Sequence, residues 1–108
     1  MAATPEKKVK MKVAAVLADE GVYFFMPPAN GYGRAGIPDI IACINGLFLG
    51  IETKANGNKP TALQVRELES IRRNNGVAVV VDETNWEMLR PMIRKLKAST
   101  IILPEGSE

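Results

Sequence analysis

Hydrophobic residues recur three or four positions apart near the start of the chain, which is the spacing of one helix face. They are Val9, Val13, Val16 and Leu17. Thr4 and Pro5 precede them, and this pair is typical of a helix start because a threonine side chain caps free N–H groups and proline fits the first turn. Gly21 is a typical helix end, so the pattern predicts a helix from Pro5 to just before Gly21.

Three apolar runs with strand composition follow this helix. The first spans residues 22–27 and is ended by prolines. The second and third, residues 39–44 and 47–54, flank Asn45-Gly46, and this dipeptide between apolar runs is the strongest short signal for a two-residue hairpin turn. We therefore expect the second and third runs to pair as antiparallel strands.

A capping box, Thr61 with Gln64, predicts a second helix that ends near Asn75. Its buried side is expected to comprise Leu68 and Ile71, with Leu63 or Val65. Residues 77–81, VAVVV, predict a buried strand.

The pair Thr84 and Glu87 has the spacing of a second capping box and predicts the last helix. The residues expected to be buried there are Trp86, Leu89, Met92, Ile93 and Leu96. The resulting order is helix, three strands, helix, strand, helix, which is typical of an α/β domain. A chain of 108 residues fits one domain, with a core at about 4–98 and a loose tail at 104–108.

The composition limits the possible chemistry. The chain has no histidine and a single cysteine, so histidine-based acid–base catalysis, a zinc site of thiolates or imidazoles and an internal disulfide are excluded. Cys43 lies in an apolar run and is expected to be a buried structural thiol. Any metal ion has to be a hard cation held by oxygen atoms. Without a signal peptide or a run of transmembrane length, we expect a cytoplasmic protein with no membrane contact.

The net charge of +2 is too small to indicate a nucleic-acid partner by itself. Four lysines nevertheless cluster near the N-terminus: Lys7, Lys8, Lys10 and Lys12. Such a run is more often the solvated face of a helix than a binding surface. If the helix does bind DNA, Lys7 and Lys10 are the candidates for phosphate contacts.

The Asn45-Gly46 turn determines which residues of the hairpin face each other. Further out along the strands Asp39 faces Glu52, and Lys54 lies on the same side two residues beyond Glu52. Facing Cβ atoms lie about 4.5–5.5 Å apart, so one of the two carboxylates takes up a proton unless a cation lies between them. Mg²⁺ needs only a few protein oxygens, so the hairpin predicts a metal site with a lysine beside it.

The alternative is that these three residues are ordinary charges at the end of a strand. An exposed ion pair of that kind contributes only about 0–1 kcal/mol to stability. It would not explain why Asp39, Glu52 and Lys54 converge on one face directly after a glycine-rich loop. We therefore favour the metal site.

Pro38-Asp39, followed after twelve residues by Glu52-Thr53-Lys54, resembles the PD-(D/E)XK nuclease superfamily. The segments GYGRAGIPD, NG, IETK and PTALQ, in this order, resemble the virus-type replication–repair nuclease domain (VRR-NUC). The resemblance extends from about Glu6 to Val81. It implies an α/β, restriction-endonuclease-like fold with an αβββαβ core, a central mixed sheet flanked by helices, and a C-terminal helix.

The resemblance also implies roles for single residues. The catalytic residues would be Asp39, Glu52, Lys54 and Gln64. The metal ligands would be Asp39, Glu52, the carbonyl of Thr53 and Glu6, and Arg34 would contact the DNA backbone. Three of these residues have alternative explanations: Gln64 closes its own capping box, Glu6 is favoured in a first helical turn by the helix dipole, and Arg34 can be an ordinary loop arginine.

The implied activity is Mg²⁺- or Mn²⁺-dependent hydrolysis of DNA in a bacterial or phage-infected cell, without an organic cofactor. The expected substrate is a Holliday (four-way) junction, resolved by a homodimer. The alternatives are a nuclease for flaps or non-specific duplex DNA and a catalytically inert DNA-binding module. Apolar residues outside the predicted core, among them Phe24, Phe25 and Met26, can form either a dimer interface or additional core.

Overall fold

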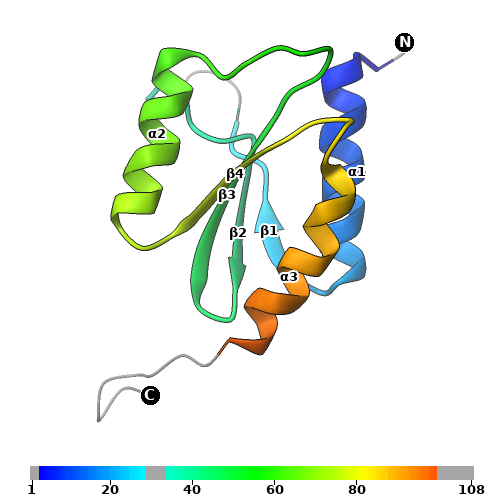
Figure 1. Cartoon of the computed structure of the whole chain (residues 1–108), viewed down its shortest axis with the longest axis vertical. Coiled ribbons are helices and arrows are strands. Elements are labelled where there is room, and N and C mark those ends of the chain that lie inside the picture. The colour runs from blue at the N-terminus through cyan, green and yellow to red at the C-terminus, as the bar shows by residue number, and fades with distance from the viewer. Residues whose placement is uncertain (1–2, 29–33, 100–108) are drawn as a thin grey trace.

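The computed structural model describes residues 3–28 and 34–99 (Figure 1). In chain order the elements are α1 (Pro5–Asp19), β1 (Tyr23–Phe25), β2 (Ile40–Ile44), β3 (Leu47–Thr53), α2 (Ala62–Arg73), β4 (Val77–Val81), the 3₁₀-helix η1 (Trp86–Met88) and α3 (Leu89–Ala98). This order confirms the predicted succession of helices and strands. The tail predicted at 104–108 lies outside the described residues.

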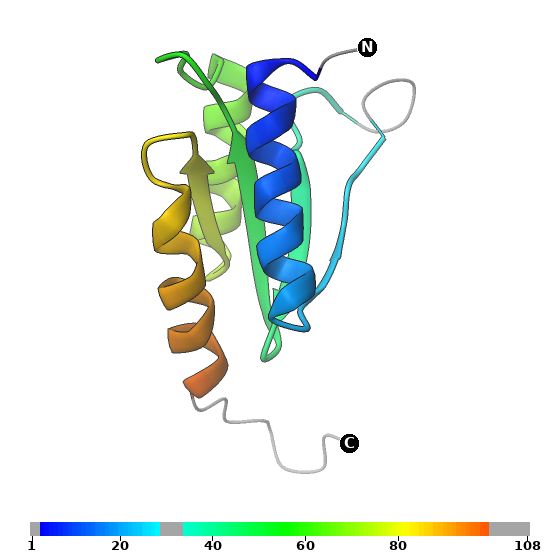
Figure 2. The same cartoon turned by 90° about the vertical axis from the view of Figure 1, so that its right-hand side faces the viewer.

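The strands form one mixed sheet in the order β1-β2-β3-β4. Strand β2 is antiparallel to both β1 and β3, whereas β4 is parallel to β3. Helices α1 and α3 lie on one side of the sheet and α2 on the other (Figures 1 and 2). The predicted mixed sheet with flanking helices is therefore confirmed. Within the described part of the chain no helix combines the length and apolar character needed to cross a membrane.

The hydrophobic core lies between the sheet and the pair α1 and α3. Its fully buried members are Val13, Leu17, Ile40, Leu49, Ile51, Val81, Leu89 and Ile93. Full burial of one such side chain contributes about 1.5–3 kcal/mol. The core includes the predicted stripe of α1 and the predicted buried positions of α3, and Trp86, Met92 and Leu96 pack against it.

The hairpin of β2 and β3 has the predicted register. Asn45 and Gly46 both have positive φ angles, +52° and +82°, as a type I′ turn requires. Ile44 pairs with Leu47, and Ile40 pairs with Ile51. One step further out, the same register brings Asp39 opposite Glu52.

Helix α2 begins with the predicted capping box, in which Thr61 and Gln64 each bond to the backbone of the other. The expectation that Leu63 or Val65 lies on its buried side is wrong, because both are exposed. The buried residues are Leu68 and Glu67, the latter a charged residue. Helix α2 packs on β3 and β4 along the side that carries Leu68, so Leu63 and Val65 lie beside the contact rather than in it.

The second predicted capping box, at Thr84 and Glu87, is wrong. The N–H and hydroxyl of Thr84 both donate to the carboxylate of Asp82, at 2.8 and 2.6 Å, which makes a local turn instead of a helix cap. Neither η1 nor α3 has a side-chain cap, and the last α-helix begins only at Leu89.

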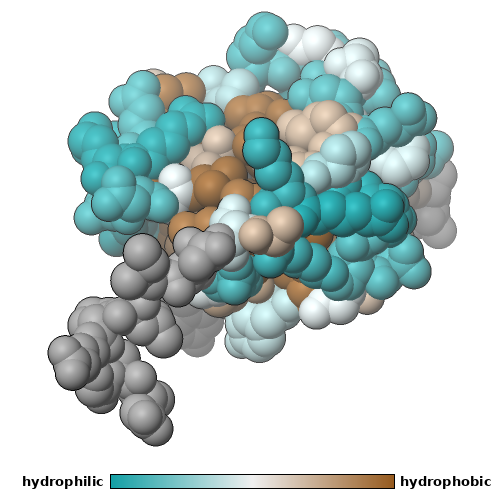
Figure 3. All heavy atoms as spheres, turned by 60° about the horizontal axis from the view of Figure 1, so that its bottom comes forward, coloured by the Kyte–Doolittle hydropathy of each residue, from teal (hydrophilic) through white to brown (hydrophobic). Residues whose placement is uncertain are grey.

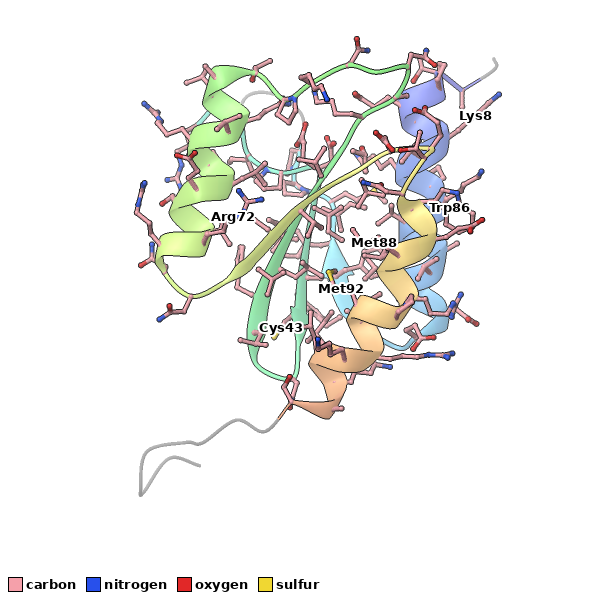
Figure 4. The ribbon with its side chains drawn as sticks, viewed as in Figure 1. Lys8, Cys43, Arg72, Trp86, Met88 and Met92 are labelled. Atoms are coloured by element: carbon pink, nitrogen blue, oxygen red, sulfur yellow. The ribbon has the colours of Figure 1, made fainter. Side chains whose placement is uncertain are left out.

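The prediction that Cys43 is buried is also wrong, because its side chain is exposed. Cys43 lies on β2 close to the hairpin turn (Figure 4). It alternates with the core residues Ala42 and Ile44 and thus belongs to the face turned away from α1 and α3. Because α2 packs on β3 and β4, it leaves this part of β2 uncovered.

Candidate active site

Asp39 precedes β2 and is tied to the end of β3 through Thr53. Its Oδ2 accepts hydrogen bonds from the Thr53 N–H at 2.9 Å and from the Thr53 hydroxyl at 2.8 Å. Thr53 is fully buried, so this anchor is rigid. Both bonds engage one oxygen of the carboxylate, and Oδ1 can therefore serve another partner.

Glu52 lies beside Asp39 and is 1% exposed. Its Oε2 is 3.4 Å from Nζ of Lys54, whereas its Oε1 has no hydrogen-bond partner within the described residues. Burial and the nearby charge of Asp39 raise the pKa of Glu52 to about 7. An unpartnered buried carboxylate oxygen is costly, so this position favours either a proton or a cation.

Lys54 completes the group at the end of β3. Its backbone N–H donates to the carbonyl of Val81 at 3.0 Å, which places it firmly beside β4. Its Nζ lies 3.4 Å from Oε2 of Glu52 and 3.9 Å from Oε1 of Glu6 on α1. The ammonium group is therefore held between a carboxylate of the sheet and a carboxylate of the first helix.

The residues present fit a hard divalent cation with few protein ligands. Asp39 and Glu52 supply two carboxylates, and the unpartnered Oε1 of Glu52 is an open ligand position. Among residues 3–28 and 34–99 no three acidic, thiol or imidazole side chains converge as a metal site. Glu6 pairs with Lys54 instead of completing such a group. Two carboxylates are enough for Mg²⁺, which keeps several water molecules and binds substrate phosphate oxygens.

The four lysines of α1 point in two different directions. Lys7 and Lys10 line a hollow of about 270 Å³ together with Asp39 and Thr53. Lys12 instead lies over the ring of Trp86, with Nζ 5.1 Å from its centroid. Lys8 points away from the sheet (Figure 4). Helical spacing therefore turns two of the lysines toward the carboxylates and two away from them.

Comparison with known proteins identifies the family of this chain. No family model matches the chain. The protein "Putative nuclease p44" of Acyrthosiphon pisum secondary endosymbiont phage 1 is 33% identical over 72 residues, which are 66% of this chain and 73% of that protein. A solved structure described as "VRR_NUC domain" is 26% identical, covers 87% of this chain and 95% of its own, and superposes with a TM-score of 0.63. The chain belongs to the VRR-NUC family of nucleases.

Two further solved structures share the VRR-NUC fold. A "VRR_NUC domain protein" superposes with a TM-score of 0.65 at 22% identity, covering 89% of this chain and 90% of its own. Hjc of Archaeoglobus fulgidus, described as a Holliday junction resolvase, superposes with a TM-score of 0.56 at 17% identity, covering 81% of this chain and 98% of its own. These superpositions confirm the predicted restriction-endonuclease-like fold.

In this VRR-NUC domain, Gln64 lies in its capping box. The side-chain Oε1 of Gln64 accepts a hydrogen bond from the backbone N–H of Thr61 at 2.8 Å. The backbone N–H of Gln64 donates to the Thr61 hydroxyl at 3.3 Å. The side-chain oxygen of Gln64 is therefore already engaged in capping the start of α2. A catalytic role of Gln64 remains a prediction.

Arg34 is also held by α2. Its Nε lies 3.0 and 2.9 Å from the two carboxylate oxygens of the buried Glu67, while its side chain is 73% exposed. Two residues later Gly36 packs so closely on α2 that a Cβ there would lie 2.6 Å from the carbonyl oxygen of Leu63. The segment leading to Asp39 is therefore fastened to α2, and the DNA contact of Arg34 remains a prediction.

Two functional contacts of the VRR-NUC domain were not foreseen. The hydroxyl of Thr53 holds Asp39, although only the Thr53 carbonyl was considered as a ligand. The hairpin register gave no signal for this contact, because Thr53 alternates with Glu52 and its side chain is expected on the other face of the strand from Asp39. Glu67 binds Arg34, and the available signal was its spacing of four residues from Ile71, which places it on the buried side of the helix.

Proposed function

We propose that the protein is a Mg²⁺- or Mn²⁺-dependent DNA endonuclease of the PD-(D/E)XK type. The observation that carries this proposal is the buried Oε1 of Glu52, which lacks a partner among the described residues and lies beside a second carboxylate, Asp39. The ligands would be Asp39, Glu52 and the carbonyl of Thr53, with Glu6 as a further ligand, direct or through water. When bound, a divalent ion lowers the pKa of an attacking water and offsets charge on the phosphate.

The other residues near the carboxylates have compatible roles. Lys54, buried beside Glu52, orients the attacking water or stabilises negative charge that develops on the phosphate. Lys7 and Lys10 line the hollow that opens at Asp39 and would bind the DNA backbone. Thr53 keeps the Asp39 carboxylate in one orientation. Hydrolysis by this set requires no histidine.

We further propose a four-way junction as the substrate and a homodimer as the active form. Resolution of a junction requires two cuts, and two active sites related by a two-fold axis supply them. Support comes from the shared fold with Hjc, a protein described as a Holliday junction resolvase. The rival substrates are flaps and non-specific duplex DNA.

The test compares cleavage of an end-labelled four-way junction with cleavage of a linear duplex of the same sequence. Each is incubated with Mg²⁺, with Mn²⁺ and with chelator. We expect paired, symmetric cuts in the junction alone, abolished by chelator and by Glu52→Gln or Asp39→Asn. Glu69→Gln, at an exposed carboxyl on α2, is the matched control. Cleavage by Glu52→Gln at the wild-type rate would exclude the proposed metal site.

The remaining outcomes separate the alternatives. Metal-dependent cutting of every substrate keeps the nuclease and removes the junction preference. Salt-sensitive DNA binding by folded protein without cleavage identifies an inert binding module. Lys54→Met tests the role of the buried ammonium group. Lys8→Met is its control, because Lys8 is exposed on α1 and points away from the sheet.

A further inference from the structure

Three contacts fasten the segment before Asp39 to α2. The first is the ion pair of Arg34, and the second is the close approach of Gly36 to the first turn of the helix. The third contact lies one residue before Asp39, where the buried Pro38 packs between β3 and α2. The proposed ligand Asp39 is therefore approached along a chain segment that α2 holds at three places.

Gly50, in the middle of β3, makes the room that Pro38 occupies. It is buried and pairs with Ile41 on one side and with Ala78 on the other. A Cβ at this position would lie 2.7 Å from Cδ1 of Ile71 and 3.1 Å from Cγ of Pro38. Both side chains converge on the bare backbone of Gly50, as is typical of a strand glycine that another part of the chain approaches closely.

The gap between β3 and α2 is filled differently on the two sides of Ile71. Seen from the hairpin end, hydrophobic residues lie between hydrophilic flanks (Figure 3). Toward this end the gap contains a hollow of about 290 Å³, lined among others by Phe48, Ile71 and Gly76. Toward Asp39 the ring of Pro38 occupies the gap. The Ile71 side chain therefore has free space on one side and the proline ring on the other.

Pro38 is joined stiffly to Asp39. The pyrrolidine ring fixes φ of Pro38 at about −65° and restricts the preceding Ile37 to extended conformations. The residue that follows is Asp39, whose carboxylate accepts two hydrogen bonds from Thr53 at 2.9 and 2.8 Å. A displacement of the proline ring therefore moves the acceptor of both bonds.

We propose that Pro38 is a positioning residue for Asp39, and that it acts in this way because Gly50 has no side chain. A methyl group on Gly50 would press on both Ile71 and Pro38. Ile71 can turn into the hollow beside it, because Cδ1 is the end of a side chain with alternative rotamers. The ring of Pro38 has no such rotamers, so its backbone has to move, and Asp39 moves with it.

This proposal rests on the proposed metal site, but the contact itself can be measured without metal. The N–H of Thr53 donates to Asp39, whereas the N–H of the next residue, Lys54, donates to the carbonyl of Val81 at 3.0 Å. A general loss of stability speeds hydrogen exchange at both amides, whereas loss of the Asp39 contact speeds exchange at Thr53 alone. The ratio of the two exchange rates therefore reports the position of Asp39.

Amide hydrogen exchange is measured by NMR in the presence of chelator. We expect Gly50→Ala and Pro38→Ala each to speed exchange at Thr53 about tenfold relative to Lys54. The first variant displaces the proline ring, and the second removes it. An unchanged ratio in folded Pro38→Ala would overturn the proposal, and this variant decides alone if Gly50→Ala does not fold.

Gly76→Ala is the matched control, because it presses on the same Ile71 from another direction. A Cβ there would lie 2.7 Å from Cγ2 of Ile71 and 3.2 Å from the carbonyl oxygens of Ile71 and Phe48. It should destabilise the protein but leave the ratio of the two exchange rates unchanged. If Gly76→Ala raises the ratio as much as Gly50→Ala does, the effect runs through Ile71 and the role of Pro38 is refuted.

Thermal unfolding at increasing Mg²⁺ concentration gives a second measurement. Loss of a residue that supports a metal ligand typically costs 10–100-fold in metal affinity. Gly50→Ala and Pro38→Ala should therefore need about tenfold more Mg²⁺ for half-maximal stabilisation, and Gly76→Ala should need as much as wild type. Unchanged Mg²⁺ requirements in the first two variants would also overturn the proposal. Absence of any Mg²⁺ effect in the wild type would overturn the proposed metal site instead, on which the exchange ratio does not depend.

Discussion

Thr53 holds the carboxylate of Asp39 with two hydrogen bonds to one oxygen, Oδ2, at 2.9 and 2.8 Å. The donors are the backbone N–H, which any residue except proline would supply, and a hydroxyl on Cβ, which only serine or threonine supplies. The orientation of the proposed ligand Asp39 thus depends partly on a side chain that touches no substrate. Loss of such a supporting contact typically costs 10–100-fold in metal affinity or activity.

Thr53→Val is therefore expected to require more Mg²⁺ for half-maximal cleavage, by about tenfold, because the isosteric side chain cannot hold Asp39. Thr53→Ser keeps the hydroxyl and should remain near wild type. The measurement is the initial cleavage rate as a function of Mg²⁺ concentration. An unchanged Mg²⁺ dependence in Thr53→Val would show that the backbone N–H alone positions Asp39.

The raised pKa of Glu52 predicts a pH-dependent stability. Burial and Asp39 raise this pKa from 4.5 to about 7. Between these values the folded metal-free protein keeps a proton that the unfolded chain has released, so the Glu52 contribution to stability falls as pH rises through this window. Glu52→Gln removes the contribution and should exceed wild type in stability by about 1–3 kcal/mol at pH 8, with little difference at pH 4.

Urea unfolding at pH 4 and pH 8 in the presence of chelator measures this difference. Glu69→Gln, which replaces an exposed carboxyl, should differ equally little from wild type at both pH values. Mg²⁺ at pH 8 should stabilise the wild type, because it binds the Glu52 carboxylate of the folded protein and not the unfolded chain. It should not stabilise Glu52→Gln, which lacks this carboxylate. A stability difference that is the same at both pH values would contradict a raised pKa of Glu52.

The Arg34–Glu67 pair predicts a stability coupling that is separable from DNA binding. The arginine is largely exposed, so a double-mutant cycle of Arg34→Ala and Glu67→Gln should give about 0.5–1 kcal/mol. If Arg34 also contacts DNA, Arg34→Ala weakens DNA binding and reduces its salt dependence, while Glu67→Gln leaves both unchanged. Equal loss of DNA binding in the two variants would show that Arg34 acts only by fastening its loop to α2.

Substitutions of Gln64 can separate its capping of α2 from a catalytic role. Gln64→Ala removes one half of the capping box and should cost about 0.5–1 kcal/mol. Gln64→Glu keeps an acceptor for the N–H of Thr61, so we expect wild-type stability, and a lowered cleavage rate if Gln64 has the predicted catalytic role. Thermal unfolding and junction cleavage measure the two effects. A folded Gln64→Glu variant with lost cleavage would place Gln64 in the catalytic set.

Much of the candidate site follows from local pattern. The Asn45-Gly46 turn and the alternation of strand residues are properties of neighbouring positions, so the register that sets Asp39 against Glu52 was predictable. The raised pKa of Glu52 was predictable from the same register, because its causes are burial and the carboxylate of Asp39 that faces it. The orientation of Asp39 toward Thr53 was not predictable, since it depends on how β2 begins against the last residue of β3.

The sequence by itself determined the order of helices and strands, the hairpin register and the convergence of Asp39, Glu52 and Lys54, because short-range periodicity and turn chemistry specify all three. Only the tertiary structure decided which surfaces are covered. The exposure of Cys43, the buried Glu67 and the exposed Leu63 all follow from the placement of α2 over β3 and β4, away from β1 and β2. That placement is set by contacts between residues far apart in the chain, which periodicity within one element does not encode.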